Sequence, residues 1–500
     1  MSTTASVSEV MATSGVAFGT SGARGLVAAM TDQVCFTYTC AFLQHMAAIG
    51  QFAPGTGVAI AGDLRPSSPR IMQACAAAIR HMGGVVVDCG FVPSPAVAAY
   101  GFARSIPSLM VTGSHIPDDR NGIKFNRTDG EILKPDEMAM REQTVALPDL
   151  FDAQGMLRDA PVTEAVVDAA GPYVERYVAA FGPGALSGLK LGVYEHSAVG
   201  RDVLARIVET LGAEVVRLGR SDRFIPVDTE AVRPEDVVLA RDWAASLGLD
   251  AILSIDGDSD RPLLADETGT WMRGDVLGIL CARALGIAAV ATPVSCNTAL
   301  ELSGTFAQVA RTRIGSPFVI EAMNGLVQHH GAVCGYEANG GFLLATPANG
   351  RVLKATLPAL PTRDAVLPML AVLCDAKAAG KSLSALQADL PARYTFSERI
   401  KDVPTAQSKA LLAELEAGDT PAILARLTQA FGDLAGTATA HDVTDGLRIT
   451  FDGSDIVHLR PSGNAPELRC YTESASPERA QTLNAEALAL VGRMVAATVA

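Results

Sequence analysis

The chain has 500 residues, which is too long for one ordinary domain and predicts roughly three or four. Hydrophobic residues make up 49% and charged residues 19% of the sequence, a balance that supports buried cores and excludes long disordered tracts. Lys and Arg number 40 against 54 Asp and Glu, so the net charge is −14. This charge repels a nucleic-acid backbone, although it allows a local basic pocket for a small phosphate.

Nine cysteines are scattered between Cys35 and Cys470 with no Cys-x-x-Cys pair, which indicates neither a zinc ribbon nor a disulfide framework. We expect reduced, mostly buried thiols in a cytosolic protein. The N-terminal sequence MSTTASVSEVMATSG lacks the basic start and apolar core of a secretory signal, and we expect it to form a mobile arm. The longest weakly polar stretch, residues 277–294, predicts a helix, a turn and a buried strand rather than a membrane span.

A pattern of alternating strands and helices is repeated three times. The first copy follows Gly57 with the run VAIAG and ends at SLMVT, the second runs from KLGVY to AILSI, and the third runs from AAVATPV to AVCGY. Each copy ends in a polar, glycine-containing loop directly after a strand, which is where open α/β sheets bind ligands. The predicted fold class is therefore α/β.

The chain changes character from about Arg393. Two helical stretches rich in Ala and Leu precede the strands GLRITF and DIVHLR, and a long helix begins near Pro477. This is an α+β pattern, unlike the three repeated units. We expect four domains, at residues 1–150, 151–270, 271–385 and 386–500.

The first repeated unit leads into a loop at residues 112–117 that contains Ser114 and His115, and Lys124 follows shortly after. A serine at a strand end can act as a nucleophile or phosphate carrier if an imidazole or a lysine manages the hydroxyl proton. A serine in such a loop can equally be an ordinary cap. The loop is therefore a nucleophile candidate only in combination with the others.

The second unit leads into three carboxylates at alternate positions, Asp256, Asp258 and Asp260. These acids repel one another unless a cation neutralises them, and all-oxygen ligation selects Mg²⁺ or Ca²⁺. The spacing resembles the opening of an EF-hand, but Arg261 occupies the position where that loop needs glycine, and a strand precedes the loop. A solvated acidic turn is the remaining alternative.

Two further loops carry groups suited to a sugar phosphate. Glu337 and Asn339 lie among glycines that let a ligand approach the backbone, and a carboxylate is a good acceptor for vicinal sugar hydroxyls. Residues 460–466 offer a guanidinium, a hydroxyl, an amide and backbone N–H groups for a phosphate. The residues in question are Arg460, Ser462, Gly463 and Asn464. Taken singly, each loop is also compatible with an ordinary turn.

In combination, the loops resemble those of the α-D-phosphohexomutase superfamily and, within it, the bacterial phosphomannomutase/phosphoglucomutase branch. Besides the four loops, the resemblance rests on FGTSGARG at residues 18–25, DLRPSS at 63–68 and DGLR at 445–448. These signatures occur in family order and cover nearly the whole chain.

The resemblance implies four domains around a central cleft, three with a shared mixed-sheet α/β core and a C-terminal α+β domain that closes on phosphate. Ser114 would carry the phosphoryl group, and it would bind Mg²⁺ together with Asp256, Asp258 and Asp260. Four side chains would surround the transferring group: Arg24, His115, Arg261 and Lys124, the last being the preferred general acid/base. Glu337 and Asn339 would bind sugar hydroxyls. The non-reacting phosphate would be held by Arg460, Ser462, Gly463 and Asn464.

The implied activity is the interconversion of hexose 6-phosphate and hexose 1-phosphate, with mannose preferred and glucose also accepted. Phospho-Ser114 would donate to the free hydroxyl, and the resulting 1,6-bisphosphate would turn over in the closed site and return its other phosphate. A hexose 1,6-bisphosphate would act as primer. We expect a cytoplasmic monomer or weak dimer without nucleic-acid or membrane partners.

Three loops depart from the usual family sequences. Gly113 and Ile116 replace residues of Thr-Ala-Ser-His-Asn-Pro, and Asn339 and Gly341 replace the Ser and His of Gly-Glu-x-Ser-Gly-His. In the phosphate loop, Asn464-Ala465 replaces the Thr-Glu of Arg-Pro-Ser-Gly-Thr-Glu-Pro. The changes bear on the substrate more than on the reaction type.

Two alternatives stay open, a phosphoglucosamine mutase and a catalytically silent sugar-phosphate-binding protein. The second is disfavoured because Ser114, Lys124 and the three aspartates are all present. A haloacid-dehalogenase-type mechanism is excluded, because that class needs Asp-x-Asp-Gly near the N-terminus and this chain has Asp-Gly-Asp in its middle.

Overall fold

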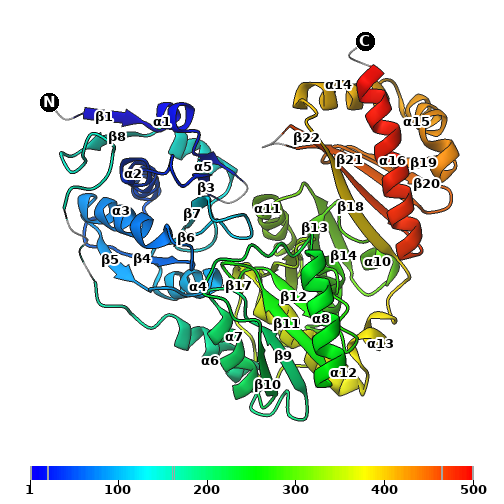
Figure 1. Cartoon of the computed structure of the whole chain (residues 1–500), viewed down its shortest axis with the longest axis horizontal. Coiled ribbons are helices and arrows are strands. Elements are labelled where there is room, and N and C mark those ends of the chain that lie inside the picture. Colours follow the sequence, from blue (N-terminus) through cyan, green and yellow to red (C-terminus); the bar gives the residue numbers. More distant parts are fainter. Residues whose placement is uncertain (1–2, 20–21, 160–161, 163, 463–465, 498–500) are drawn as a thin grey trace. The chain divides into compact units, whose positions relative to one another are not determined.

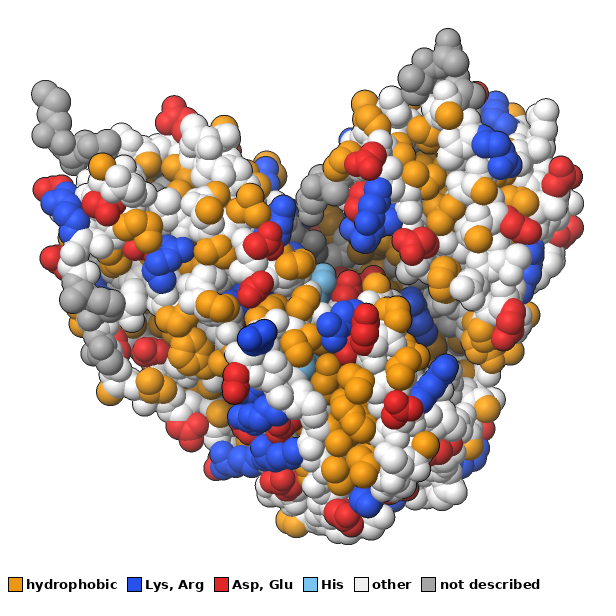
Figure 2. Space-filling model, viewed as in Figure 1, with side chains coloured by type: hydrophobic (Ala, Val, Ile, Leu, Met, Phe, Trp, Pro, Cys, Tyr) orange, Lys and Arg blue, Asp and Glu red, His pale blue; other side chains and the backbone are white. Residues whose placement is uncertain are grey.

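A computed structural model describes residues 3–19, 22–159, 162, 164–462 and 466–497. The chain forms two compact units: unit 1 comprises Met1–Val290 and Gly315–Gln387, and unit 2 comprises Ala291–Ile314 and Ala388–Ala500. All nine cysteines are buried thiols, as the sequence predicts. No helix in the described part of the chain is both long and apolar enough to span a membrane. On the face shown in Figure 2, basic and acidic side chains are interspersed over both units.

Unit 1 begins with a mixed sheet of strand order β2-β3-β7-β6-β4-β5. Its strands are β2 (Ala17–Phe18), β3 (Ala23–Leu26), β4 (Gly57–Gly62), β5 (Val85–Asp88), β6 (Ser108–Val111) and β7 (Arg120–Asn126). Its helices are α2 (Asp32–Ala48), α3 (Ser68–His81), α4 (Ser94–Arg104) and α5 (Lys134–Arg141). β4 pairs in parallel with β5 and β6, whereas β7 pairs antiparallel with β6 and β3. In Figure 1, α3 and α4 lie on opposite sides of this sheet.

From Thr3 onward the N-terminal segment is regular structure, so the prediction of a mobile arm was wrong. Strand β1 (Thr3–Ser6) pairs antiparallel with β8 (Thr144–Leu147), and helix α1 (Val7–Ser14) follows directly. Val7 is fully buried, and Val10 and Met11 pack against the core of this domain. Apolar residues at positions 7, 10 and 11 form one face of a helix, and burial of this face fixes the segment.

A second mixed sheet of unit 1 has the strand order β10-β9-β11-β12. Its strands are β9 (Lys190–Tyr194), β10 (Glu214–Leu218), β11 (Ala251–Ile255) and β12 (Pro262–Ala265), and its helices are α6 (Ala170–Phe181), α7 (Arg201–Thr210) and α8 (Pro234–Leu247). β9 pairs in parallel with β10 and β11, and β12 is antiparallel to β11. Every residue of β11 is buried, which explains its unbroken apolar sequence. The acidic loop follows β11 directly.

The third part of unit 1 contains antiparallel strands β15 (Val333–Tyr336), β16 (Phe342–Leu344) and β17 (Leu360–Asp364). Its helices are α9 (Gly274–Ala284), α11 (Ser316–Leu326), α12 (Val366–Ala379) and α13 (Leu383–Gln387). The predicted stretch 277–294 forms part of α9, a turn and the buried strand β13 (Ala289–Pro293), as expected. The loop with Glu337 and Asn339 connects β15 to β16, so a hairpin holds both ends of it.

Unit 2 contains an antiparallel sheet of strand order β18-β22-β21-β20-β19. Its strands are β18 (Tyr394–Lys401), β19 (Ala438–Asp442), β20 (Leu447–Phe451), β21 (Ile456–Pro461) and β22 (Glu467–Ser474). The sheet shares one core with α14 (Thr405–Leu415), α15 (Thr420–Ala435) and α16 (Pro477–Ala497). The short helix α10 (Ala299–Leu302) and β14 (Gln308–Thr312) also belong to this unit. The predicted α+β character is confirmed, and β20 and β21 are the two strands that the sequence predicts.

Candidate active site

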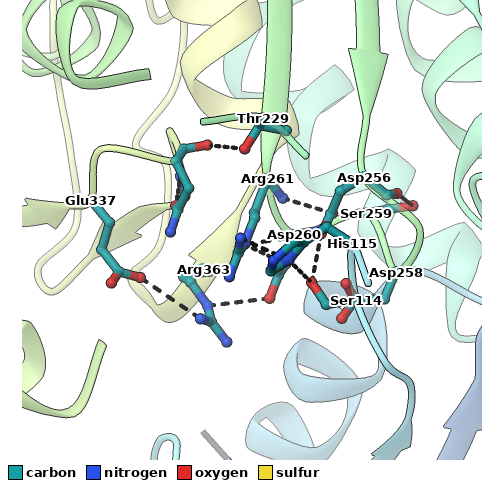
Figure 3. A network of polar contacts seen from close by, with 12 residues as sticks. Ser114, His115, Thr229, Asp256, Asp258, Ser259, Asp260, Arg261, Glu337 and Arg363 are labelled. Atoms are coloured by element: carbon teal, nitrogen blue, oxygen red, sulfur yellow. Dashed lines mark hydrogen bonds and ion pairs between the residues drawn. The ribbon is translucent and has the colours of Figure 1, made fainter. Parts of the chain in front are cut away.

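Ser114 lies in the loop after β6 and points toward the acidic loop (Figure 3). Its φ of 57° falls in the left-handed region, which is rare for a residue with a side chain. The backbone N–H of Ser114 donates to Thr112 Oγ1 at 2.7 Å, and Ser114 Oγ donates to Asp256 Oδ2 at 2.7 Å. This backbone conformation therefore aims the hydroxyl of one domain at the carboxylates of the next.

A buried arginine holds the Ser114 loop in place, and sequence reasoning did not assign it this role. Arg65 Nε donates to Asp63 Oδ2 at 3.0 Å, and its Nη atoms donate to the carbonyl oxygens of residues 114, 116, 117 and 120 at 2.6 to 3.0 Å. All five guanidinium N–H donors are thereby used. A Cβ added to Gly113 would lie 2.6 Å from Arg65 Cζ. The glycine at position 113, where the family usually has alanine, thus leaves space for the guanidinium to lie against the loop.

The three predicted metal-binding aspartates come together at the carboxyl end of β11. Asp256, Asp258 and Asp260 are buried, and each offers an oxygen within 4.8 Å of the other two. Oδ1 of Asp258 and Oδ1 of Asp260 accept no hydrogen bond from the described residues. Buried carboxylate oxygens without a donor are the ligands that a hard divalent cation prefers. The residues present therefore fit a divalent metal ion.

Lys124, on β7, neutralises part of this acidic cluster. Its Nζ lies 2.5 Å from Oδ2 of Asp258 and 2.5 Å from Oδ2 of Asp260. Burial, followed by the two neighbouring carboxylates, raises the pKa of Asp256 well above its ordinary value. Burial would also raise the pKa of Asp260, but Arg363, Lys124 and Arg261 lower it below its ordinary value. The cluster is therefore an acidic site balanced by Lys124 of β7, Arg363 of β17 and the adjacent Arg261.

Two of the other predicted catalytic residues are joined directly, because Arg261 Nη1 donates to His115 Nδ1 at 2.9 Å. His115 Nδ1 is also 3.4 Å from Ser114 Oγ. Burial, and then Arg261, lowers the pKa of His115 to about 3, so the ring is neutral at pH 7. Burial, and then Arg261, lowers the pKa of Arg24 to about 10, which leaves it charged at pH 7. Arg24 lines one small pocket together with Lys124.

Glu337 and Asn339 are both buried in the hairpin loop between β15 and β16. Asn339 stabilises this loop: its Oδ1 accepts the N–H of Gly341 at 2.9 Å, and its carbonyl accepts Thr229 Oγ1 at 2.7 Å. Arg363, which sequence reasoning missed, lies between this loop and the acidic loop (Figure 3). Its Nε is 3.2 Å from Asp260 Oδ2, and its Nη1 is 3.7 Å from Glu337 Oε2.

The predicted phosphate loop belongs to unit 2. Arg460 and Pro461 are the last two residues of β21, and Arg460 Nε donates to Asp445 Oδ2 at 2.7 Å. Ser462 is buried. Gly463 and Asn464, the other two predicted residues, lie outside the described residues. The Asp445–Arg460 pair links the DGLR sequence to the phosphate loop within this unit.

Comparison with known proteins covers most of the chain. Models of the phosphoglucomutase/phosphomannomutase family match in order: alpha/beta/alpha domain I at residues 15–146, domain II at 172–269, domain III at 273–394 and the C-terminal domain at 403–490. These matches confirm the predicted fold class of three α/β domains and a different C-terminal domain.

Individual relatives agree with the family matches. The chain is 47% identical over 474 residues to a phosphomannomutase of Salmonella muenchen, covering 94% of this chain and 95% of the relative. It is 45% identical over 480 residues to a phosphomannomutase of Sinorhizobium fredii, covering 95% and 99%. The crystal structure of a putative phosphomannomutase from Thermus thermophilus shares the fold with a TM-score of 0.72 at 21% identity, covering 95% of this chain and 99% of that chain. The chain therefore belongs to the phosphoglucomutase/phosphomannomutase family of α-D-phosphohexomutases.

Proposed function

We propose that this protein interconverts hexose 6-phosphate and hexose 1-phosphate, with mannose preferred and glucose also accepted, and that the phosphoryl group passes through Ser114. The observation that carries the proposal is Ser114 Oγ, held 2.7 Å from Asp256 Oδ2 in a buried cluster of three carboxylates. The two relatives at 45% and 47% identity, both named phosphomannomutase, support mannose. A phosphoglucosamine mutase of Rhodospirillum centenum is 33% identical over 391 residues, so the amino-sugar alternative has weaker support.

In the proposed site, Asp256, Asp258 and Asp260 would hold Mg²⁺ together with an oxygen of phospho-Ser114. Bound there, the ion would neutralise charge that develops on the transferring group. Arg24 and Arg261 would contribute fixed positive charge around the same group, and neutral His115 would accept the hydrogen bond that orients Arg261. The chain's own cations thus prepare the site for a phosphoryl group.

Proton transfer is assigned to Lys124. In the forward step the bond between phosphorus and Ser114 Oγ breaks, and the hydroxyl of the substrate forms the new P–O bond and loses its proton. Ser114 Oγ gains a proton in the same step. Lys124 is the proposed carrier because its Nζ lies against the acidic loop that binds Ser114 Oγ. After the 1,6-bisphosphate has reoriented in the site, the same groups serve the reverse step, in which its other phosphoryl group returns to Ser114.

The proposed roles follow the predicted domain boundaries. Residues 1–150 would carry the phosphoserine loop, 151–270 the metal loop, 271–385 the sugar loop with Glu337 and Asn339, and 386–500 the phosphate loop. Arg460, Ser462, Gly463 and Asn464 would bind the non-reacting phosphate. We further propose a hexose 1,6-bisphosphate as primer and a cytoplasmic monomer or weak dimer. The nine buried thiols fit a reducing compartment.

Replacing Arg460 with alanine is expected to raise the KM for glucose 1-phosphate roughly 10- to 100-fold with a smaller change in kcat, because a charge-assisted phosphate contact is lost. Arg399→Ala is the matched control, since Arg399 is an exposed arginine of the same sheet that pairs with Glu467 at 3.4 Å. A KM that is the same in both variants and in the wild type would show that the phosphate loop does not bind the substrate.

The activity itself is tested by ³¹P NMR time courses with mannose 1-phosphate, glucose 1-phosphate and glucosamine 1-phosphate, in Mg²⁺ with a trace of glucose 1,6-bisphosphate. Conversion to 6-phosphates, with the largest kcat/KM for the mannose compound, is the expected result. A largest kcat/KM for the glucosamine compound would favour the amino-sugar alternative. No conversion of any hexose phosphate would contradict the proposed function.

A further inference from the structure

The sugar loop of this chain has a glycine, Gly341, at the position where its family usually carries histidine. A Cβ added to Gly341 would lie 3.0 Å from both Cγ and Cδ of Arg363. The stem of Arg363 therefore lies in the space where a side chain at position 341 would begin. Arg363 belongs to β17, which is two strands away from β15 in the sheet. The cation next to Gly341 therefore comes from outside the sugar loop.

Arg363 is buried beside the loop, among carboxylates. Only 3% of its side chain is exposed, and its Nε lies 3.2 Å from Asp260 Oδ2 and 3.9 Å from Glu131 Oε1. Glu131 in turn accepts the hydroxyls of Ser316 and Thr362, each at 2.9 Å. Carboxylates from two other domains therefore place the guanidinium before any ligand binds, which lowers the ordering cost of a contact with a ligand.

Glu337, on the other side, has an unused acceptor. Its Oε2 is buried and accepts no hydrogen bond from the described residues, and Arg363 Nη1 lies 3.7 Å away. This separation is too long for a direct hydrogen bond. A carboxylate only accepts and a guanidinium only donates, whereas a hydroxyl does both. One hydroxyl that lies beside the pair, within hydrogen-bond distance of both atoms, would donate to Glu337 and accept from Arg363.

We propose that Arg363 is a specificity-determining residue of the sugar site: its stem occupies the space that Gly341 leaves open, and its guanidinium binds one hydroxyl of the hexose phosphate jointly with Glu337. The inference rests on the proposed function. It gives the departure at position 341 a role, because the glycine admits a cation from β17. It also places one guanidinium against both a metal-loop carboxylate and the sugar loop, so the ligand hydroxyl has a fixed position relative to Asp260.

The test is calorimetric binding of glucose 6-phosphate and its 2-, 3- and 4-deoxy analogues in the presence of Mg²⁺. The Ser114→Ala background blocks turnover, so affinity is measured alone. One analogue is expected to bind that background about 10- to 100-fold more weakly than glucose 6-phosphate, as a buried site does when a hydroxyl partner is missing. Adding Arg363→Met should weaken the binding of glucose 6-phosphate by a similar factor. It should also reduce the deoxy penalty, which is the loss of affinity caused by removing that hydroxyl, to less than about threefold, because both changes remove the same interaction.

Three further variants separate this role from a structural one. Arg363→Lys keeps the charge near Asp260 and should recover part of the affinity, and Gly341→Ala should displace the Arg363 stem and reduce the deoxy penalty. Arg351→Met is the control, because Arg351 pairs with buried Asp375 at 2.7 Å in the same domain and should keep the full penalty. Titration with Mn²⁺ reports whether Arg363→Met also changes metal affinity.

An unchanged deoxy penalty in both Arg363→Met and Gly341→Ala would overturn the inference while leaving the proposed function intact. An unchanged affinity for glucose 6-phosphate in Arg363→Met would do the same. If the Ser114→Ala protein and the unsubstituted chain both failed to bind any hexose phosphate, the proposed function itself would fail, and the inference with it.

Discussion

Substituting Ser114 with alanine is expected to lower kcat by at least about 10⁴-fold, as the loss of a nucleophile does in enzymes that form a covalent intermediate. The change removes the hydroxyl alone, and with it the hydrogen bond that joins this loop to Asp256. A coupled assay with glucose 1-phosphate measures the effect. Circular dichroism and the melting temperature show whether the fold is retained.

A control for this variant needs a buried serine hydroxyl with a comparable hydrogen bond. Ser254, the last residue but one of β11, is fully buried and donates to the carbonyl oxygen of Tyr194 at 2.8 Å. Ser254→Ala should lose about 1 kcal/mol of stability and keep its turnover. Near-normal turnover in Ser114→Ala would show that another group carries the phosphoryl transfer.

Asp258→Asn is expected to weaken Mg²⁺ binding by at least about 10- to 100-fold, the loss that is typical even when a partner of a metal ligand is removed. The buried Oδ1 of Asp258 accepts no hydrogen bond from the described residues. The substitution removes the negative charge that would attract a cation to this atom. In the wild-type protein, Mg²⁺ at 100 times its Kd should stabilise the fold by about 2.7 kcal/mol. Melting temperatures over a series of Mg²⁺ concentrations therefore report binding without reference to turnover.

Asp266→Asn is the matched control for this prediction. Asp266 is also buried and follows β12, where its Oδ1 accepts the N–H groups of Thr268 and Thr270 in a tight turn. The control should respond to Mg²⁺ as the wild type does, even if its melting temperature is lower. Equal Mg²⁺ responses in Asp258→Asn and the wild type would exclude Asp258 from the metal site.

The elements that the sequence predicts well are those whose signal is local. The buried strand β11 is continuously apolar, and the acidic loop follows it directly, so both the strand and the metal candidates can be read from adjacent residues. The same is true of Ser114 after β6. The N-terminal segment was predicted wrongly, because its few apolar residues form a helix face only when the domain core is present to cover it.

The two arginines that complete the site have no comparable local signal. Arg65 lies within a family motif, but its role depends on carbonyl groups from about 50 to 55 residues further along, which turn toward it only in the folded loop. Arg363 lies in the short strand β17, and its partners Asp260 and Glu337 come from two loops that are distant in the sequence. The glycines at 113 and 341 read as losses in the sequence, whereas each leaves room for one of these arginines.

Phosphorylation of Ser114 is measured most directly by incubating the purified protein with glucose 1,6-bisphosphate, then determining the intact mass and mapping the phosphopeptide. We expect one phosphoryl group on Ser114. This group should be lost from the protein when mannose 1-phosphate is added and should appear in mannose 1,6-bisphosphate. A protein that converts hexose phosphates while Ser114 stays unmodified, or that carries the phosphoryl group on another residue, would contradict the phosphoserine mechanism.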